Sequence, residues 1–363
     1  MADTKKKPVA KAPPATTGMS GMRVVVVRKH GGAEALVEEE RPIPEPAPDE
    51  VVVAVKACAL NPLDVWVRKG VEGWTFPLPL VPGSDIAGTV HRVGTAVPGV
   101  RPGDRVALAP GVSCGSCQCC LSGRDHLCFQ YGLLGEIRDG GYADFVAVPA
   151  RNLVPLPASL SFEEGAAVPL SFLTAWHMLV ARAELRTGET VLIHEAGSGV
   201  GSAAVQIAKL WGARVIATAG GRDHQRRARL LGADDVINSK GEDLASAIAR
   251  VTGARGVDVV VEHLGAGTWA DSMRCLARGG RLVMRGATGG KDARIDLRQV
   301  WVKHLSILGS TTGSRAELNE LWRFVEDGRL KPVVDIVLPL SKVAQAQQLL
   351  EDRKVFGKVV VTP

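Results

Sequence analysis

Short runs of β-branched and small apolar residues alternate with turns rich in proline and glycine over the first 160 residues. The runs lie at 24–27, 51–55, 86–93, 106–109 and 143–148. This punctuation is typical of β-strands joined by tight turns. The pattern therefore predicts a small, mainly β domain that begins near Met22.

Between residues 172 and 312 the pattern changes to strands that alternate with helices. A strand predicted at 191–194 leads into a stretch in which apolar residues recur at helical spacing. These residues are Val200, Ala203, Ala204, Ile207, Ala208 and Trp211. Such alternation continues to the end of the segment and predicts βαβ units with a parallel sheet.

The last 50 residues show two helical patterns, near 317–325 and 343–350, before a closing strand at 358–361. A segment of this size is too short to be a domain of its own. We expect it to pack back on the first domain.

Composition narrows the class of protein. The chain has 363 residues, of which 46% are hydrophobic and 23% charged, values close to those of globular proteins. The formal net charge is +6, but residues 1–20 hold four lysines against one aspartate, so the remainder is only weakly basic. We therefore expect no nucleic-acid partner. The sequence has no run of about 18 apolar residues and suggests neither a membrane anchor nor secretion, so we expect a cytoplasmic protein.

A glycine-containing turn follows the strand predicted at 191–194. It reads EAGSGVG at 195–201 and opens the amphipathic helix. A pyrophosphate fits such a place, because small residues let the backbone approach it and the unpaired N–H groups of the first helical turn stabilise its charge. The turn predicts a dinucleotide site, with a tight turn that binds nothing as the alternative.

The residues after the next predicted strand bear on which dinucleotide is bound. NAD-binding chains carry an acidic residue there, about 20 residues after the glycines, that bonds the ribose hydroxyls. Here Gly220 and Gly221 are followed by Arg222. A guanidinium suits a 2′-phosphate, so the sequence favours NADPH. The alternative is that Arg222 and the arginines after it form a solvated helix face.

Five of the seven cysteines lie within residues 114–128. Four of them, Cys114, Cys117, Cys120 and Cys128, have the spacing of a loop that folds around a tetrahedral zinc ion. A site with four thiolates leaves no position for substrate, so we predict a structural role. Cys119 is then a spare thiol and His126 an alternative ligand.

Together these features resemble the medium-chain dehydrogenase/reductase superfamily, also described as zinc-binding alcohol dehydrogenase-like proteins, and within it the quinone oxidoreductase-like branch. The resemblance rests on several separate motifs. They are NPLDVWVRKG (61–70), PGSDIAGTVHRVG (82–94), GDRV (103–106), the cysteine segment, LTAWHML (173–179), AGSGVG (196–201) and FGKVVV (356–361). It implies an α/β chain, with a GroES-like β domain joined to a Rossmann doubly wound parallel sheet.

The resemblance also implies a division of the chain into four parts. These are a disordered tail at 1–21, a GroES-like catalytic domain at 22–171 with a zinc lobe at 111–135, a Rossmann domain that binds NADP at 172–312, and a C-terminal return to the catalytic domain at 313–363. The active site is expected in the cleft between the two domains.

The positions that hold a catalytic zinc in the zinc alcohol dehydrogenases of this superfamily carry other residues in this chain. Where those enzymes have Cys, the His of a Gly-His-Glu motif and a further Cys or acid, this chain has Asn61, Ser84 before Asp85, and Leu170 or Ser171. Without such ligands an alcohol loses the Lewis acid that would stabilise its alkoxide. The structural zinc lobe is intact, which many quinone reductase-like proteins lack.

The resemblance assigns further residues. Asn61 and Thr174 are implied near the nicotinamide as catalytic residues, and Lys358 near the pyrophosphate. The other residues implied to line the cofactor are Ser198, Gly199, Val200, Gly201, Gly220, Arg222, Leu264, Gly286, Ala287 and Thr288.

These expectations favour an NADPH-dependent reductase that holds one structural zinc and passes hydride to a small conjugated acceptor, such as a quinone, an enone or an enoyl thioester. Conjugation spreads the developing charge onto oxygen, where the Asn61 amide or a cofactor hydroxyl could stabilise it. The alternatives are a zinc-type alcohol dehydrogenase or carbonyl reductase, and a non-catalytic NADPH-binding protein. By analogy with the superfamily we expect a homodimer or homotetramer.

Overall fold

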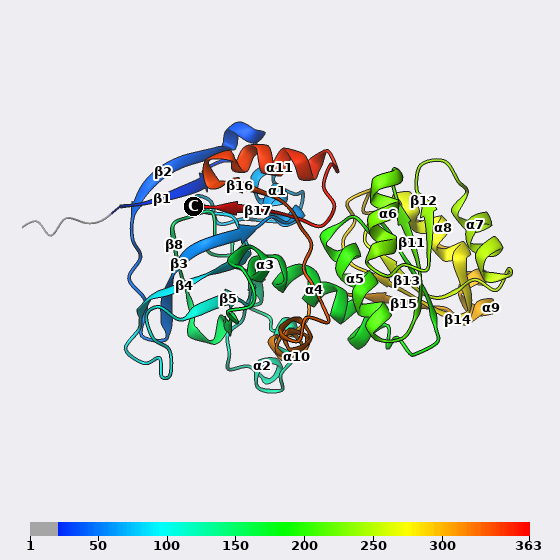
Figure 1. Cartoon of the computed structure of the whole chain (residues 1–363), viewed down its shortest axis with the longest axis horizontal. Helices are drawn as coiled ribbons and strands as arrows, with labels where there is room; N and C mark the ends of the chain where they lie inside the picture. Colours follow the sequence, from blue (N-terminus) through cyan, green and yellow to red (C-terminus); the bar gives the residue numbers. More distant parts are fainter. Residues whose placement is uncertain (1–20) are drawn as a thin grey trace, which may run out of the picture.

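The protein is described here by a computed structural model that covers residues 21–363. The tail predicted at 1–21 lies outside the described residues except for Gly21, which opens the first strand. The described chain forms two lobes, with the C-terminus in the same lobe as the first strands (Figure 1).

The first lobe is built on a mainly antiparallel sheet. Its strands, in spatial order, are β16 (Val334–Pro339), β17 (Lys358–Thr362), β3 (Glu50–Ala59), β4 (Asp85–Val93), β5 (Arg105–Leu108) and β9 (Leu153–Pro155), with β8 (Phe145–Pro149) paired to β3. Two small sheets, β1 (Gly21–Val27) with β2 (Leu36–Pro42) and β6 (Gly111–Val112) with β7 (Gly132–Leu133), complete it. The pairing of β17 with β3 places the C-terminal segment in the sheet of the first lobe.

Short helices pack around this sheet (Figure 1). They are α1 (Pro62–Lys69), α2 (Gln118–Leu121), α3 (Phe162–Ala167), α4 (Pro169–Trp176), α10 (Arg315–Glu326) and α11 (Val343–Glu351). Helix α1 begins in a capping box: the Asn61 side chain and the N–H of Asp64 face each other, while the carboxylate of Asp64 accepts from the N–H of Asn61 at 2.8 Å. This local pattern fixes Asn61 at the start of the helix.

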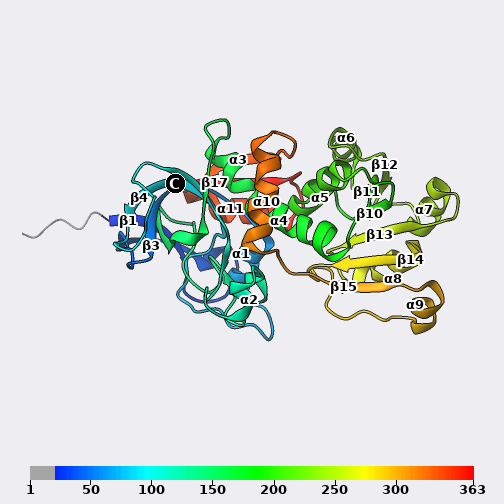
Figure 2. The same ribbon diagram turned by 90° about the horizontal axis from the view of Figure 1, so that it is seen from below.

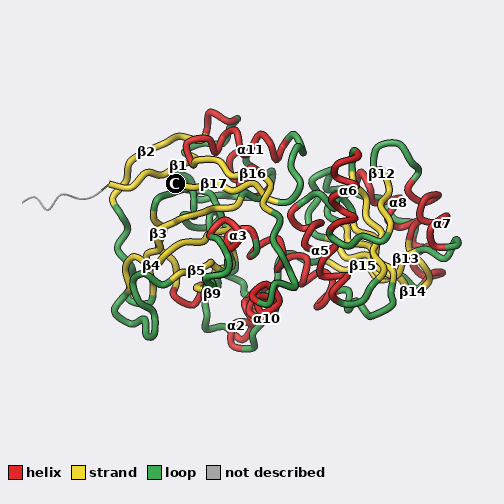
Figure 3. The backbone as a smooth tube through the Cα atoms, in the orientation of Figure 1, coloured by secondary structure: helices red, strands yellow, loops and turns green. Residues whose placement is uncertain are grey.

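The second lobe is a six-stranded parallel sheet. Its order is β12 (Asp235–Asn238), β11 (Arg214–Ala219), β10 (Thr190–Ile193), β13 (Val257–Glu262), β14 (Leu276–Met284) and β15 (Ser306–Gly309). This is the doubly wound order, in which the strands run parallel and their sequence order reverses between β10 and β13. Figure 3 shows the strands gathered in two separate groups, one in each lobe. The predicted α/β fold class is confirmed.

Helices cover both faces of the parallel sheet. They are α5 (Gly199–Leu210), α6 (Arg222–Leu230), α7 (Leu244–Thr252), α8 (Ala266–Cys275) and α9 (Leu297–Lys303). Side chains of β10 alternate between the two faces: Val191 and Ile193 belong to the cluster that includes α5, and Leu192 to the cluster that includes α7 and α8. A strand buried on both faces explains the continuous apolar sequence of β10.

The two lobes share a core through α4. This helix packs against α5 of the second lobe and against α10, and Figure 2 shows these helices side by side between the sheets. The cluster runs from Ala57 of β3 through Phe172 and Trp176 to Val191 of β10. The junction between the lobes is therefore apolar and packed, and the residues at its edge are held in place.

Two local features differ from what the sequence pattern indicates. The alternating pattern predicts a strand at 281–285, which is the second half of the longer β14, and Arg285 lies after it. The spacing of Asp64 and Arg68, one helical turn apart, suggests a supporting ion pair, but they form none; Arg68 bonds Glu351 of α11 at 2.5 Å instead. No helix among residues 21–363 is long and apolar enough to cross a membrane.

Candidate active site in the cleft between the lobes

The glycine turn opens α5 at the carboxyl end of β10, beside the point where the strand order reverses. Ser198 is the N-cap, and its hydroxyl accepts from the N–H of Gly201 at 2.9 Å. The N–H groups of Gly199 and Val200 belong to the first turn and have no acceptor within the helix. They are free to bind an anion, which supports the predicted pyrophosphate position.

Gly201 shows why this turn needs glycine. A Cβ at Gly201 would lie 2.2 Å from the carbonyl oxygen of Glu195, a backbone atom that cannot move aside. Gly199 is in contact with the opposite lobe, since its Cβ would lie 3.0 Å from Cδ of Lys358. The turn is therefore packed between β10 and the C-terminal segment, and Gly357 donates to the carbonyl of Gly197 at 2.7 Å.

Two loops that follow β13 and β14 form one surface beside the turn. They hold the predicted cofactor residues Leu264, Gly286, Ala287 and Thr288. The N–H of Gly289 donates to the carbonyl of Leu264 at 2.5 Å, and that of Ala266 to the carbonyl of Gly290 at 3.1 Å. The structure thus brings these predicted residues together, although they lie more than 20 positions apart in sequence.

Glu262 fixes the first of these loops, and sequence reasoning did not identify it. This fully buried carboxylate accepts from the N–H groups of Leu264 at 2.8 Å and Gly265 at 3.1 Å, and from the hydroxyl of Ser272 at 2.6 Å. Burial opposes its ionisation, but nearby His194 and these donors hold its pKa below the usual value. Burial also lowers the pKa of His194, to about 4. The sequence does carry a signal for this residue, because Glu262 is an acidic residue at the end of a strand made mostly of valines.

The adenosine end of the site lies where β11 meets α6. Gly220 follows β11 directly, Gly221 is the N-cap of α6, and Arg222 is the exposed first residue of that helix. The neighbouring arginines are engaged elsewhere: Arg226 bonds Asp223 at 2.9 Å and Arg227 bonds Asp335 at 2.7 Å. Among the described residues, no carboxylate lies within 4.0 Å of the Arg222 guanidinium. It is thus the first arginine of the run left open to a ligand.

Lys240 is a second cation at this end that sequence reasoning did not identify. It follows β12, the strand next to β11, and its Cε lies 3.6 Å from the position of a Cβ on Gly220. A lysine one strand away from the glycine turn carries no local sequence signal. Its position becomes clear only from the strand order.

A buried polar cluster lies where the two lobes meet. Nζ of Lys358 donates to Oδ1 of Asn61 at 2.7 Å and to Oδ2 of Asp85 at 2.9 Å, and Nδ2 of Asn61 donates to the same Asp85 oxygen at 3.0 Å. The other Asp85 oxygen accepts from the N–H of Leu170, at the start of α4, at 2.7 Å. All three cluster side chains are at most 5% exposed. Lys358 therefore spans from the glycine turn to Asn61.

Two hydroxyl groups near this cluster are buried without a partner. Thr174, one turn along α4 from Leu170, and Ser84, which precedes Asp85, are fully buried, and neither side-chain oxygen has a hydrogen-bond partner among the described residues. Unpaired buried hydroxyls cost free energy and mark positions where a ligand can supply the missing bond. A polar cofactor group fits beside Thr174.

Apolar and aromatic residues form the wall next to the cluster. The buried set comprises Leu63, Val67, Phe76, Leu80, Leu133 and Leu170, with Trp66, Leu78 and Tyr131 packed on it. Trp74, from the loop after α1, lies edge-on to Trp66 at 6.2 Å between ring centroids and is half exposed. This wall suits a flat apolar ligand. Tyr131 belongs to it, and burial raises the pKa of its hydroxyl.

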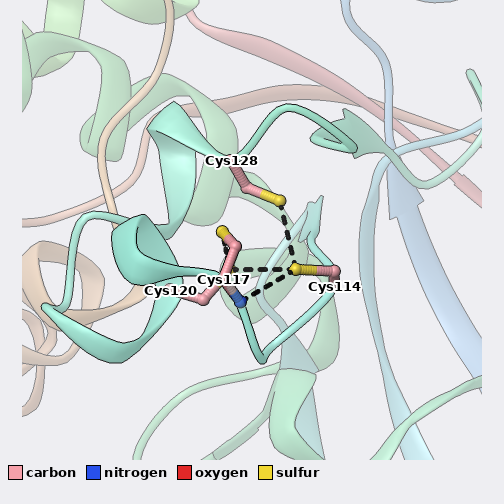
Figure 4. Close-up of side chains that lie close together, drawn as sticks. All are labelled: Cys114, Cys117, Cys120 and Cys128. Carbon is pink, nitrogen blue, oxygen red and sulfur yellow. Dashed lines mark hydrogen bonds between the residues drawn. The ribbon is translucent and has the colours of Figure 1, made fainter.

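The four predicted cysteines converge in the lobe that contains α2 (Figure 4). Their Sγ atoms all lie within 4.8 Å of one another, with contacts of 3.5 Å between Cys117 and Cys120 and 3.6 Å between Cys114 and Cys128. Four sulfurs at about 2.3 Å from a tetrahedral zinc would be roughly 3.8 Å apart, so the arrangement fits the ion. N–H groups of Ser116 and Cys117 lower the pKa of Cys114 to about 5, which favours the thiolate.

Within the described residues this is the one group of three or more His, Cys, Asp or Glu side chains arranged to hold a metal. Cys119 and His126 do not belong to it. His126 instead packs against His177 at 4.8 Å between ring centroids, and His177 bonds Glu317 at 2.8 Å. The residues at the three catalytic-zinc places, Asn61, Ser84 and Leu170 or Ser171, do not fit a zinc ion.

A separate cavity of about 690 Å³ opens elsewhere, between the first strands and the cysteine lobe. Its wall includes Met22, Arg41, Cys114 and Arg138 but no residue of the parallel sheet. We place the candidate site at the glycine turn and the polar cluster rather than in this cavity, because the chemistry converges there.

Comparisons with known proteins agree with this geometry. Residues 199–327 match the family described as "Zinc-binding dehydrogenase", and residues 47–158 match "Alcohol dehydrogenase GroES-like domain". The chain is 32% identical over 354 residues to quinone oxidoreductase of Rattus norvegicus, a match that covers 95% of this chain and 99% of the relative.

Solved structures of dehydrogenases and reductases also resemble this chain over nearly its whole length. A crystal structure of an NAD-dependent alcohol dehydrogenase is 51% identical, with a TM-score of 0.91, and the match covers 94% of this chain and 99% of that one. A variant of the crotonyl-CoA carboxylase/reductase AntE in complex with NADP is 25% identical, with a TM-score of 0.88 and 97% of both chains covered. These proteins differ in reaction and cofactor, so the likeness defines a superfamily and not a substrate.

Proposed function

Because the chain belongs to the medium-chain dehydrogenase/reductase superfamily of zinc-binding alcohol dehydrogenase-like oxidoreductases, we propose that it is a reductase that transfers hydride from NADPH to a conjugated acceptor: a quinone, an enone or an enoyl thioester. The observation that carries this proposal is that the three catalytic-zinc places hold no zinc ligand set: Asn61, at the first place, instead bonds Asp85 and Lys358. A conjugated acceptor needs no Lewis acid in the cleft, because its own π system spreads the developing charge.

The chain's own residues support each part of this reaction. We propose that the free N–H groups at the start of α5 bind the pyrophosphate and that Thr174 contacts the nicotinamide end. The bound cofactor would supply the hydride. The aromatic wall around Trp66 and Phe76 would orient the acceptor and exclude water. Relatives named for quinone and crotonyl-CoA reduction agree with this acceptor class.

The test is NADPH consumption with a matched pair of acceptors, 2-cyclohexen-1-one and cyclohexanone. Turnover of the conjugated ketone alone is expected. Turnover of cyclohexanone would contradict the proposal and favour carbonyl reductase chemistry. Tight NADPH binding without oxidation by the enone or by a quinone would favour a non-catalytic role.

Preference for NADPH is a separate part of the proposal and rests on Arg222. Its exposed guanidinium lies at the adenosine end, with Lys240 as a second cation nearby. Arg222→Ala should weaken NADPH binding roughly 10-fold or more and NADH binding little, since a charge-assisted bond contributes about 1.5–3 kcal/mol. Fluorescence titration of both cofactors measures this, and equal losses for both would contradict the assignment.

We further propose that the cysteine lobe holds one structural zinc through Cys114, Cys117, Cys120 and Cys128, and that the protein is cytoplasmic and forms a homodimer or homotetramer. The exposed edge of the parallel sheet supports self-association. Strand β15 pairs with β14 on one side only, and exposed Leu297, Trp301 and Ile307 lie on or beside it.

A further inference from the structure

We propose that Lys358 is a catalytic residue whose ammonium group binds the acceptor's carbonyl oxygen as negative charge develops on it. This assignment rests on the proposed function. It identifies the side chain that stabilises the negative charge on the acceptor during hydride transfer.

Asn61 cannot supply this hydrogen bond in the observed arrangement. A primary amide has two N–H donors. Both hydrogens of Nδ2 are engaged, one with Asp85 at 3.0 Å and one with the carbonyl of Ala59 at 3.3 Å, while Oδ1 accepts from Lys358. In place of the expectation that the Asn61 amide stabilises the oxyanion, the proposal gives Asn61 the role of holding Lys358 in place.

Lys358 is the member of the cluster that retains a donor. Its ammonium carries three N–H groups, and two are used, on Asn61 and Asp85. No third acceptor for Nζ occurs among residues 21–363. Both oxygens of the Asp85 carboxylate accept hydrogen bonds, Oδ2 from Lys358 and Asn61 and Oδ1 from the N–H of Leu170, so in the proposal Asp85 orients the ammonium and does not act as a base.

The position of the Lys358 ammonium group suits binding of the acceptor's carbonyl oxygen. Its two partners are the N-cap of α1 and the anchor of α4, and both helices contribute residues, Leu63 and Leu170, to the apolar wall. The Lys358 stem meanwhile contacts Gly199 of the glycine turn. The charge thus lies between the cofactor turn and the acceptor wall. At such a buried site a fixed positive charge acts far more strongly than it would in water.

The step balances without a metal. Hydride adds to the β carbon of the acceptor, the π electrons of the double bond move to the carbonyl oxygen, and the resulting enolate accepts a hydrogen bond from Lys358. The ammonium keeps its proton. The α carbon then takes a proton from water, which gives the saturated ketone and the oxidised cofactor.

The test compares Lys358→Met with wild type on two acceptors, 2-cyclohexen-1-one and 1,4-benzoquinone, and includes NADPH titration. Loss of one oxyanion donor lowers kcat by about 10²–10³-fold, and we expect this loss with the enone. The quinone stabilises its own negative charge better and should lose less. The family resemblance places Lys358 near the pyrophosphate, whereas the proposal directs its free N–H to the acceptor, so NADPH affinity should stay close to wild type. Lys354→Met, in the same segment but exposed and bonded to Asp352, is the matched control.

A second variant separates chemistry from folding. Lys358→Met leaves the buried Asp85 carboxylate unpaired, which is destabilising. The double variant Asp85→Asn/Lys358→Met removes that charge, and it should show the same selective loss of enone turnover.

Three outcomes would overturn the assignment. Weakened NADPH binding with equal loss on both acceptors would make Lys358 a cofactor ligand, and unchanged kinetics would make it a structural residue. Either result leaves the proposed reductase function intact. If wild type reduced neither acceptor, the proposed function would fail, and this assignment with it.

Discussion

Among single residues, Asp64 is a carboxyl group whose ionisation is opposed by burial and favoured by its hydrogen-bond donors. It is fully buried, and one oxygen accepts from the N–H of Asn61 and, at 3.1 Å, from the hydroxyl of Tyr142. The other oxygen has no partner among the described residues. Burial raises its pKa to about 6 despite these donors. The fold therefore favours the protonated carboxyl.

This balance predicts a pH dependence of stability. Between pH 4 and pH 6 the folded chain holds a proton on Asp64 that the unfolded chain releases, so the free energy of unfolding falls as pH rises through this window and stays lower above it. Asp64→Asn removes the titration. Relative to wild type, the variant should gain roughly 2–3 kcal/mol between pH 4 and pH 8.

Urea unfolding of both proteins at the two pH values measures the gain. Tyr142→Phe is a useful comparison, since it removes a donor and keeps the carboxyl. A difference between Asp64→Asn and wild type that is constant with pH would show that Asp64 does not carry the effect.

At the scale of elements, features set by neighbouring residues were predictable from sequence. The strand, glycine turn and helix at 190–210 and the cysteine lobe are encoded within short windows, so periodicity and spacing identify them. The predicted cofactor loops of β13 and β14 required the family resemblance, because only the sheet order brings them together.

Contacts between distant segments were not predictable. Asn61 and Lys358 are 297 positions apart, and the bond between them depends on β17 returning to pair with β3. Lys240 reaches the adenosine end through the order of β11 and β12. A single sequence contains no local signal for such pairs. This is why the role that we propose for Asn61 differs from the one that the sequence suggests.

The zinc content of the cysteine lobe can be tested with one of the lobe's own cysteines as the control. Cys117 lies in the sulfur cluster and Cys119, two residues later, does not. Wild type should hold about one zinc per chain, Cys117→Ser should lose it, and Cys119→Ser should retain it. Metal analysis by mass spectrometry measures the content, and limited proteolysis reports whether the loop at 114–128 opens. Equal zinc loss in both variants, or two zinc ions in wild type, would contradict the four-cysteine assignment.

For the whole molecule, the parallel sheet of the second lobe has an open edge bordered by exposed apolar side chains. The sheet ends at β15, whose residue Ile307 is exposed, and the adjacent α9 presents Leu297 and Trp301, which are 70% and 68% exposed. An uncovered strand edge beside apolar side chains is a template for pairing with another chain. A second copy satisfies it best, because two identical edges related by a two-fold axis pair antiparallel and extend both sheets.

The last prediction tests this surface by solution mass. Ile307→Asp places a charge on the edge strand, and Trp301→Glu places one on α9, so each should convert the proposed oligomer to monomer when light scattering is measured on an eluting gel-filtration peak. Leu230→Lys is the control, because Leu230 is 75% exposed on α6, away from the edge. If all three variants keep the wild-type mass, the edge of β15 is not the interface. If the Leu230 variant alone dissociates, the interface lies along α6. Dissociation through the edge variants alone would show that β15 joins the copies.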